Sequence, residues 1–159
     1  MKMGILGAGG IAGTMAATIA QMDTVESWAV AARDLSRAQA FAEKYGFQKA
    51  YGSYEEMLED PELELVYIAT LHPLHYEHVK LCLEHGKHVL CESPIATTEA
   101  ECVQLFNLAE QNHLILMDSI KTAYSTAYNR LLLMLKGGKI GHILSVDATC
   151  TSLRDVSSE

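Results

Sequence analysis

The chain has 159 residues, 49% of them hydrophobic and 20% charged, and its 12 basic and 20 acidic side chains give a formal net charge of −8. This length and composition are typical of a globular domain that buries a core of its own, not of a disordered segment. The acidic balance argues against a nucleic-acid partner, and the glycine-interrupted apolar N-terminus argues against a membrane span, which needs ~20 apolar residues.

Short apolar runs alternate with amphipathic segments along the chain, which is the pattern of successive βα units. The run LELVYIAT over residues 63–70 is typical of a strand in a parallel sheet that is covered on both faces. Capping residues precede several amphipathic segments, as Asp34 and the capping boxes that begin at Ser53 and Thr98 do. In chain order, strands are predicted over residues 2–6, 27–32, 48–51, 63–70, 88–91 and 114–117, and helices over residues 10–22, 35–45, 53–60, 74–85, 98–111 and 125–136.

The pattern changes after Gly137-Gly138. Residues 143–153 alternate polar and apolar side chains as a long strand does, and no helical pattern follows them. We therefore predict two parts of fold class α/β. Residues 1–120 form a doubly wound parallel sheet of the Rossmann type, and residues 121–159 begin a second α/β domain whose apolar strand face needs a partner surface.

The clearest local motif is GAGGIA at positions 7–12, which has the form G-x-G-x-x-A and joins the first predicted strand to the first predicted helix. Gly7 permits a tight turn, Gly9 leaves room for a pyrophosphate, and Ala12 lets the helix approach the strand. The phosphates would meet free backbone N–H groups at the positive end of the helix. The motif predicts a dinucleotide site, the alternative being glycines that only make a tight turn.

Arg33 and Asp34 follow the second predicted strand. An acidic side chain at this point binds the ribose 2′-hydroxyl of NAD, whereas a nearby arginine accommodates the 2′-phosphate of NADP. Arg33 can pair with phosphate and stack on adenine. Asp34 directly precedes a helical segment, so the interpretation as a helix N-cap is favoured for it. We predict NADP as the cofactor, with NAD as the alternative.

Five histidines fall between residues 72 and 88, and three of them, His72, His75 and His78, are spaced three apart. Imidazoles one helical turn apart could share a metal ion. No carboxylate or thiolate completes a familiar ligand set, so no metal site is predicted. His72 and His75 follow Thr70 at the carboxyl end of the fourth predicted strand, the edge at which ligands bind in open α/β sheets.

The four cysteines, Cys82, Cys91, Cys102 and Cys150, form no C-x-x-C pair and are too sparse for a secreted disulfide scaffold. They predict reduced thiols at or near the core of a cytoplasmic protein. The apolar N-terminus superficially resembles a signal peptide, but its repeated glycines replace the leucine-rich stretch of such a sequence.

Several motifs carry a family resemblance in this order: GAGGIA, AARD, YIATLHPLH, GKHVLCESP and GKIGHI. As a set they resemble the glucose–fructose oxidoreductase / inositol dehydrogenase / rhizopine catabolism (Gfo/Idh/MocA) family, especially its branch of dimeric dihydrodiol dehydrogenases. The resemblance implies an N-terminal Rossmann domain and a C-terminal α/β domain with a large open sheet. That second domain would supply substrate contacts and a homo-oligomer interface.

The same resemblance implies roles for individual residues along a bound cofactor. It places Gly7, Gly9, Gly10, Ile11 and Ala12 at the pyrophosphate, Arg33 at the adenosine ribose, Thr70, Leu71, His72 and His75 along the nicotinamide half, and Glu92 at the nicotinamide ribose.

Departures from the family pattern concern the catalytic residues. The lysine of the motif E-K-P, which contacts substrate and helps proton transfer, is replaced by Ser93, whose hydroxyl has neither the charge nor the reach of an ammonium group. Leu71 replaces a proline, and residues 118–124 replace a stretch that commonly reads E-A-M-W-T-R-F. Lys121 could project into the same cleft, the alternative being an exposed lysine. We predict Ser93, Lys121 and His75 as the catalytic substrate contacts.

The predicted function is hydride transfer between NADP and a hydroxyl-bearing carbon of a small-molecule sugar, polyol or diol. In such chemistry the cofactor carries the difficult step, and protein groups position the alcohol and handle its proton. One alternative, motivated by Ser93, is a non-catalytic NAD(P)-binding sensor or subunit. Another is a Rossmann scaffold that serves assembly only. The resemblance places the family's C-terminal acid–base residues beyond Glu159.

Overall fold

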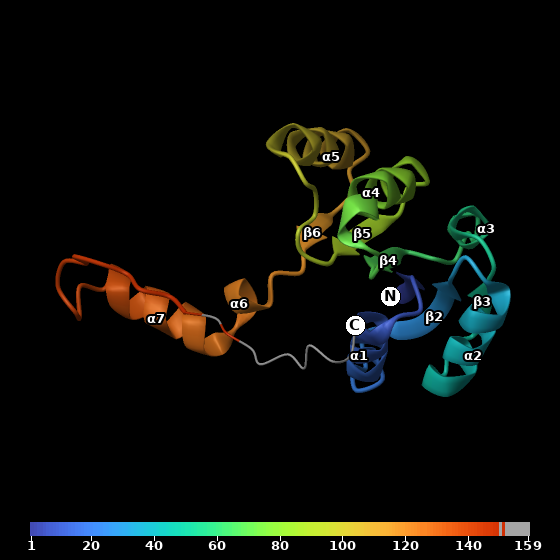
Figure 1. Ribbon diagram of the computed structural model, residues 1–159, viewed down its shortest axis with the longest axis horizontal. Coiled ribbons are helices and arrows are strands. Elements are labelled where there is room, and N and C mark those ends of the chain that lie inside the picture. Colours follow the sequence, from blue (N-terminus) through green and yellow to red (C-terminus); the bar gives the residue numbers. More distant parts are fainter. Residues whose placement is uncertain (150, 152–159) are drawn as a thin grey trace. The chain divides into compact units, whose positions relative to one another are not determined.

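The computed structural model describes residues 1–149 and 151. Its first unit, Met1–Ile120, is built on one sheet of six parallel strands in the order β3-β2-β1-β4-β5-β6 (Figure 1). The chain runs outward from β1 to β3 and then returns to place β4 on the other side of β1. The doubly wound α/β prediction is therefore confirmed. The strands are β1 (Lys2–Leu6), β2 (Glu26–Ala31), β3 (Lys49–Tyr51), β4 (Leu65–Ile68), β5 (His88–Cys91) and β6 (Leu116–Asp118).

Helices cover both faces of this sheet (Figure 1). Successive β1 side chains point to opposite faces, so Ile5 joins the apolar cluster beneath α1 and α2, and Leu6 joins the cluster beneath α3, α4 and α5. Both side chains are fully buried, and each contributes about 1.5–3 kcal/mol of hydrophobic stabilisation. The helical elements are α1 (Gly10–Ile19), α2 (Leu35–Tyr45), α3 (Tyr54–Leu58), the 3₁₀ helix η1 (His72–Leu74), α4 (His75–Glu84) and α5 (Glu99–Gln111).

Local capping explains where several of these helices begin. The predicted capping box of α5 is complete, since Thr98 Oγ1 accepts from the Glu101 amide at 3.2 Å and Glu101 Oε2 accepts from the Thr98 amide at 3.1 Å. At α3 the structure shows one half of the predicted box, in which Ser53 Oγ accepts from the Glu56 amide at 3.1 Å. The fourth strand is shorter than predicted, because its apolar run continues into loops on both sides.

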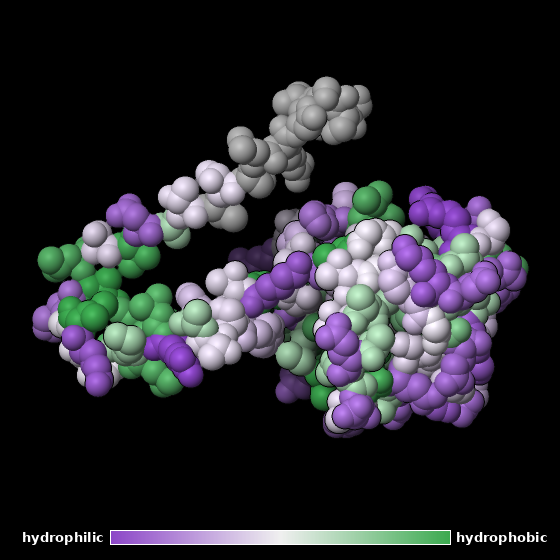
Figure 2. Space-filling view, turned by 90° about the horizontal axis from the view of Figure 1, so that it is seen from below, coloured by the Kyte–Doolittle hydropathy of each residue, from purple (hydrophilic) through white to green (hydrophobic). Residues whose placement is uncertain are grey.

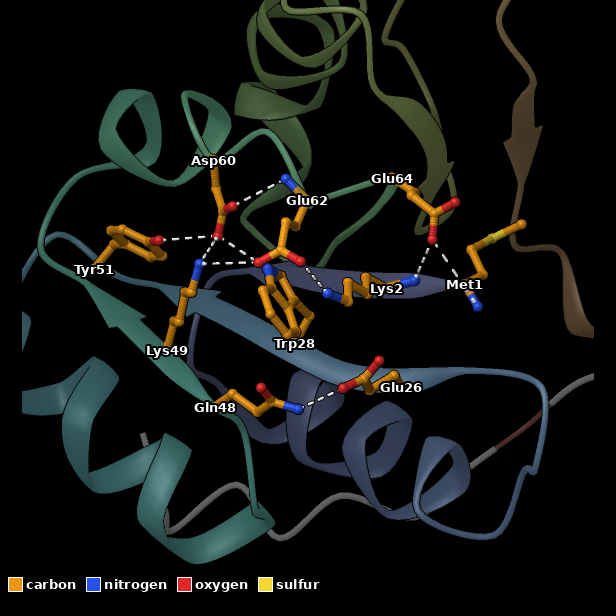
Figure 3. A network of polar contacts seen from close by, with 10 residues as sticks. All are labelled: Met1, Lys2, Glu26, Trp28, Gln48, Lys49, Tyr51, Asp60, Glu62 and Glu64. Carbon is orange, nitrogen blue, oxygen red and sulfur yellow. Dashed lines mark hydrogen bonds and ion pairs between the residues drawn. The ribbon is translucent and has the colours of Figure 1, made fainter.

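A buried carboxylate ties β2 and β3 to the loop before β4 (Figure 3). The Asp60 side chain is 1% exposed, and its Oδ2 accepts from Trp28 Nε1 at 2.9 Å, Lys49 Nζ at 2.8 Å and the Tyr51 hydroxyl at 3.1 Å. Its Oδ1 accepts from the Glu62 amide at 3.0 Å. Burial alone would raise the pKa of Asp60, but these hydrogen bonds, with Lys49 first among them, lower it to about 2.

The second unit begins at Lys121 and contains α6 (Lys121–Tyr124) and α7 (Thr126–Lys136). The Ser125 hydroxyl caps α7 by accepting from the Tyr128 amide at 3.2 Å. Sequence patterning predicted α7 but missed α6, a single turn too short to show a period. None of the helices in the described part of the chain has the length and apolar character of a membrane span.

The strand predicted over residues 143–153 is wrong for the residues that the structure describes, which are 143–149 and 151 and carry no strand. The rest of that prediction, with Cys150, lies outside the described residues. Alternation alone does not make a strand, because its backbone groups also need a neighbouring strand to pair with. The apolar side chains are nevertheless exposed as expected, Ile143 by 55% and Val146 by 79%, and Figure 2 shows hydrophobic surface gathered on this unit.

Candidate dinucleotide site

The carboxyl ends of β1, β2 and β4 open into a pocket of about 540 Å³. It lies where the strand order reverses between β1 and β4, the position at which open α/β sheets bind their ligands. Its walls combine the glycine turn, two arginines and the loop that follows β4. The lining residues are Gly7, Ala8, Gly9, Ala32, Arg33, Asp34, Arg37, Tyr54, Ala69, Thr70, Leu71 and Leu74.

The glycine turn is shaped by two different demands. At Gly7 the backbone takes φ +96°, and a Cβ there would lie 2.9 Å from the Ala69 carbonyl oxygen, so the protein itself requires a glycine. At Gly9 and Gly10 a Cβ would meet nothing within 4 Å, so both glycines keep open space in front of α1. Gly9 also offers no side chain to cap the helix, which leaves amide groups of its first turn for a ligand.

Close packing of α1 involves one residue that sequence reasoning did not single out. Ala12 is fully buried in the cluster with Ile5, as its place in the motif predicted. A Cβ at Gly13 would lie 2.5 Å from the Tyr45 hydroxyl, so this second small residue lets α1 approach α2. Ile11 is half-buried beside the same cluster.

The loop after β2 supplies the charged end of the pocket. Asp34 Oδ1 accepts from the Ser36 amide at 2.9 Å and from its hydroxyl at 2.8 Å, and these bonds lower the pKa of the carboxyl group. The N-cap interpretation of Asp34 is thereby confirmed. Arg33 and Arg37 are exposed on the same wall, with Tyr54 beside them. Sequence reasoning missed Arg37, although a second arginine only four positions after Arg33 was a usable signal for an anionic ligand.

The loop after β4 forms the opposite wall. Thr70 and Leu71 line the pocket, and Leu71 is 70% exposed. The Thr70 hydroxyl lies 2.8 Å from His78 Nδ1, which orients it, and His72 is exposed on η1. Burial lowers the pKa of His78, which favours the neutral ring. In the part of the chain that the structure describes, no three His, Cys, Asp or Glu side chains are arranged to hold a metal ion.

His75 has a different place from the one predicted for it. The sequence predicts His75 at both substrate and cofactor, but its side chain is fully buried. Its Nδ1 lies 2.7 Å from the Pro94 carbonyl oxygen, and its Nε2 lies 3.1 Å from the Thr70 carbonyl oxygen. Both ring nitrogens face backbone carbonyls of the loops after β4 and β5, and a neutral ring donates to one of the two. His75 therefore packs between these loops and does not line the pocket.

Carboxylates and hydroxyls meet at the ends of β5 and β6. Glu92 Oε1 accepts from the Tyr67 hydroxyl and, at 3.2 Å, from the Ser119 hydroxyl. Burial, and then the Glu92 bond, raise the pKa of Tyr67 far above its usual range, so this phenol stays a donor. The Ser93 hydroxyl donates to Asp118 Oδ1, a partner that sequence reasoning did not identify. Lys121 opens α6 in the second unit, so its substrate contact stays a prediction.

The reversed strand order, the open glycine turn and the basic loop after β2 define a dinucleotide-binding Rossmann domain. Residues 1–119 match the model of an oxidoreductase family with an NAD-binding Rossmann fold. The chain therefore belongs to the Gfo/Idh/MocA oxidoreductase family that its motifs resemble.

Individual relatives agree with this assignment. A trans-1,2-dihydrobenzene-1,2-diol dehydrogenase of Mus musculus is 41% identical over 145 residues, which is 90% of this chain and 44% of that protein. The enzyme of the same name from Xenopus tropicalis is 34% identical over 149 residues, which is 92% of this chain and 45% of that protein. Among solved structures, the NADP complex of a 3-ketoreductase from Actinomadura kijaniata has a TM-score of 0.82 at 29% identity, covering 89% of this chain and 45% of that one. The chain thus spans less than half of these relatives.

Proposed function

We propose that the whole protein transfers a hydride between NADP and a hydroxyl-bearing carbon of a sugar, polyol or diol. The observation that carries this proposal is the open glycine turn inside the crevice between β1 and β4. Gly7 must be a glycine because a Cβ there would clash with the Ala69 carbonyl oxygen. At Gly9 and Gly10 a Cβ would meet no protein atom within 4 Å, so the space in front of them is open to a ligand. That combination fits a pyrophosphate approaching the N-terminus of α1.

The crevice offers suitable groups along the length of a dinucleotide. Backbone amides in the first turn of α1 would bind the pyrophosphate, whereas the Gly7 amide already donates to the Ala31 carbonyl oxygen at 2.9 Å. The guanidinium groups of Arg33 and Arg37 would bind the adenosine 2′-phosphate. Thr70, Leu71 and His72 would lie along the nicotinamide half. Glu92, already oriented by Tyr67 and Ser119, would accept hydrogen bonds from the nicotinamide ribose. When bound, the nicotinamide ring supplies the hydride chemistry, and these residues orient it.

The substrate class rests on the relatives. The curated relatives are named for a dihydrobenzene diol, and the NADP complex belongs to a 3-ketoreductase. The first name describes dehydrogenation of a diol, and the second describes reduction of a keto group. A vicinal diol or a sugar is therefore the proposed substrate.

Cofactor choice gives a direct test of the site. NADPH and NADH are titrated into the purified protein and followed by cofactor fluorescence, with the Arg33→Ala variant beside the wild type. We expect Arg33→Ala to weaken NADPH at least tenfold more than NADH, because only NADPH carries the 2′-phosphate. Equal losses for both cofactors would contradict the role assigned to Arg33. Turnover is then measured with trans-1,2-dihydrobenzene-1,2-diol and with D-glucose.

A second candidate function is a non-catalytic NAD(P)-binding sensor or subunit, and Ser93 in place of the family lysine favours it. If Ser93→Lys raises turnover of these alcohols by orders of magnitude from a negligible wild-type rate, the sensor is supported. High wild-type turnover rules it out. A scaffold without cofactor predicts no NADPH binding at all, so micromolar binding eliminates that alternative.

We also propose a cytoplasmic homo-oligomer. Among the described cysteines, Cys82, Cys91 and Cys102 are free thiols, as a reducing compartment allows. The exposed apolar side chains of the second unit suit an interface formed through the C-terminal sheet. Light scattering on the whole protein gives its mass, and a monomer at micromolar concentration would contradict the oligomer.

A further inference from the structure

The pair formed by Ser93 and Asp118 lies at the ligand-binding edge of the sheet. Asp118 ends β6 and is the register partner of Cys91, which ends β5 two residues before Ser93. Both side chains of the pair are half-buried, and the Ser93 hydroxyl donates its hydrogen bond to Asp118 Oδ1. Glu92, the proposed ribose contact, comes directly before Ser93 in the chain.

This hydrogen bond decides how Ser93 can meet a substrate. A serine hydroxyl has one proton and two lone pairs, and here the proton is committed to a carboxylate. Towards a substrate Ser93 therefore presents an acceptor, whereas an ammonium group at this position could only donate. An acceptor suits an alcohol about to be oxidised, because the alcohol must give up its hydroxyl proton.

We propose, building on the function proposed above, that Ser93 Oγ takes the substrate's hydroxyl proton while its own proton passes to Asp118. In this step the C–H bond of the alcohol breaks and its electron pair leaves as hydride to the oxidised nicotinamide. The C–O bond becomes a carbonyl, Ser93 is regenerated as a hydroxyl, and Asp118 becomes a neutral carboxylic acid that releases its proton to water. Charge balances, because one carboxylate and one oxidised cofactor are neutralised together.

Other titratable groups near the pair are unsuited to this role. Glu92 Oε1 already accepts from two hydroxyls, and both nitrogens of His75 face carbonyl oxygens. Burial, and then the charges of Asp118 and Glu92, raise the pKa of the Cys91 thiol, so it stays protonated. Asp118 is the carboxylate bonded to the hydroxyl that replaces the family lysine.

The test compares Asp118→Asn, Ser93→Ala and the double variant in the whole protein. The amide oxygen of Asp118→Asn can still accept from Ser93 but cannot take a proton, so shape is kept and basicity is lost. We expect kcat for oxidation of trans-1,2-dihydrobenzene-1,2-diol to fall about 100- to 1,000-fold in each single variant. The double variant should be no slower than the slower single variant, because the two groups act in series.

Two further readouts separate proton transfer from a structural role. In Asp118→Asn, whose Ser93 still contacts the substrate, the Kd for NADPH, measured by fluorescence, and the KM for the diol should change by less than about threefold. The loss of kcat at low pH that reports an ionised acceptor in the wild type should disappear in Asp118→Asn. Glu84→Gln serves as control, since it also removes one negative charge but from an exposed side chain on α4. Its kcat should match the wild type.

The possible results distinguish failure of the Ser93–Asp118 proton relay from failure of the proposed dehydrogenase function. Wild-type turnover with an unchanged kcat in Asp118→Asn would overturn the relay and leave the dehydrogenase standing. An Asp118→Asn variant that loses NADPH binding as much as turnover would also overturn it, because the carboxylate would then be structural. NADPH binding without oxidation of any diol or sugar by the wild type would overturn the proposed function, and the relay with it.

Discussion

Replacing Asp60 by Asn tests the polar network at the amino ends of the strands (Figure 3). The pKa of this buried carboxyl group is lowered from 3.8 to about 2, which corresponds to about 2 kcal/mol of stabilisation at neutral pH. Because the pKa of Asp60 is lower in the native state, acidification protonates this carboxyl group in the unfolded chain before it does so in the folded one. The stabilisation is therefore complete above pH ~4 and is lost as the pH falls to ~2.

Chemical denaturation of the chain, followed by the fluorescence of Trp28, measures this contribution, because the indole donates to Asp60 itself. At pH 7 we expect Asp60→Asn to lower the free energy of unfolding by about 2 kcal/mol. Between pH 4 and pH 2 the wild type should lose its advantage over the variant. Glu62→Gln, which removes an exposed carboxylate paired with Lys2, should cost less than about 1 kcal/mol. A neutral-pH cost below ~0.5 kcal/mol for Asp60→Asn, or an advantage that persists at pH 2, would refute the reasoning.

Three other substitutions test separate features. Gly7→Ala forces φ +96° on alanine and a Cβ to 2.9 Å from a carbonyl oxygen, so we expect about 1–3 kcal/mol of destabilisation in thermal unfolding and loss of NADPH binding by titration. Arg37→Ala should weaken NADPH about tenfold and NADH little; an equal effect on both would contradict a 2′-phosphate contact. Thr98→Ala removes the cap of α5 and should cost about 1 kcal/mol of unfolding free energy with NADPH affinity unchanged, and a stability equal to wild type would count against the cap.

Features set by neighbouring residues were accessible from the sequence. The capping box of α5 depends on residues three apart, and the glycine turn lies within six positions, so composition and spacing predicted both. The run from 63 to 70 indicated a buried strand because covered parallel strands are apolar on both faces. Strand ends were less well predicted, since an apolar run does not stop where pairing stops. The strand predicted over residues 143–153 is absent from residues 143–149 and 151, which the structure describes, because a strand forms only where a partner strand pairs with it.

The sequence by itself thus determined the class of fold, the position of the glycine turn and the family of the chain. All three depend on motifs whose residues are only a few positions apart. Only the tertiary structure decided which polar groups meet. His75 binds the carbonyl of Pro94 across the loops after β4 and β5, and Ser93 reaches Asp118 because β5 and β6 lie side by side. Such contacts join residues that are distant in the chain, and their geometry follows from the order of the strands in the sheet rather than from any local pattern.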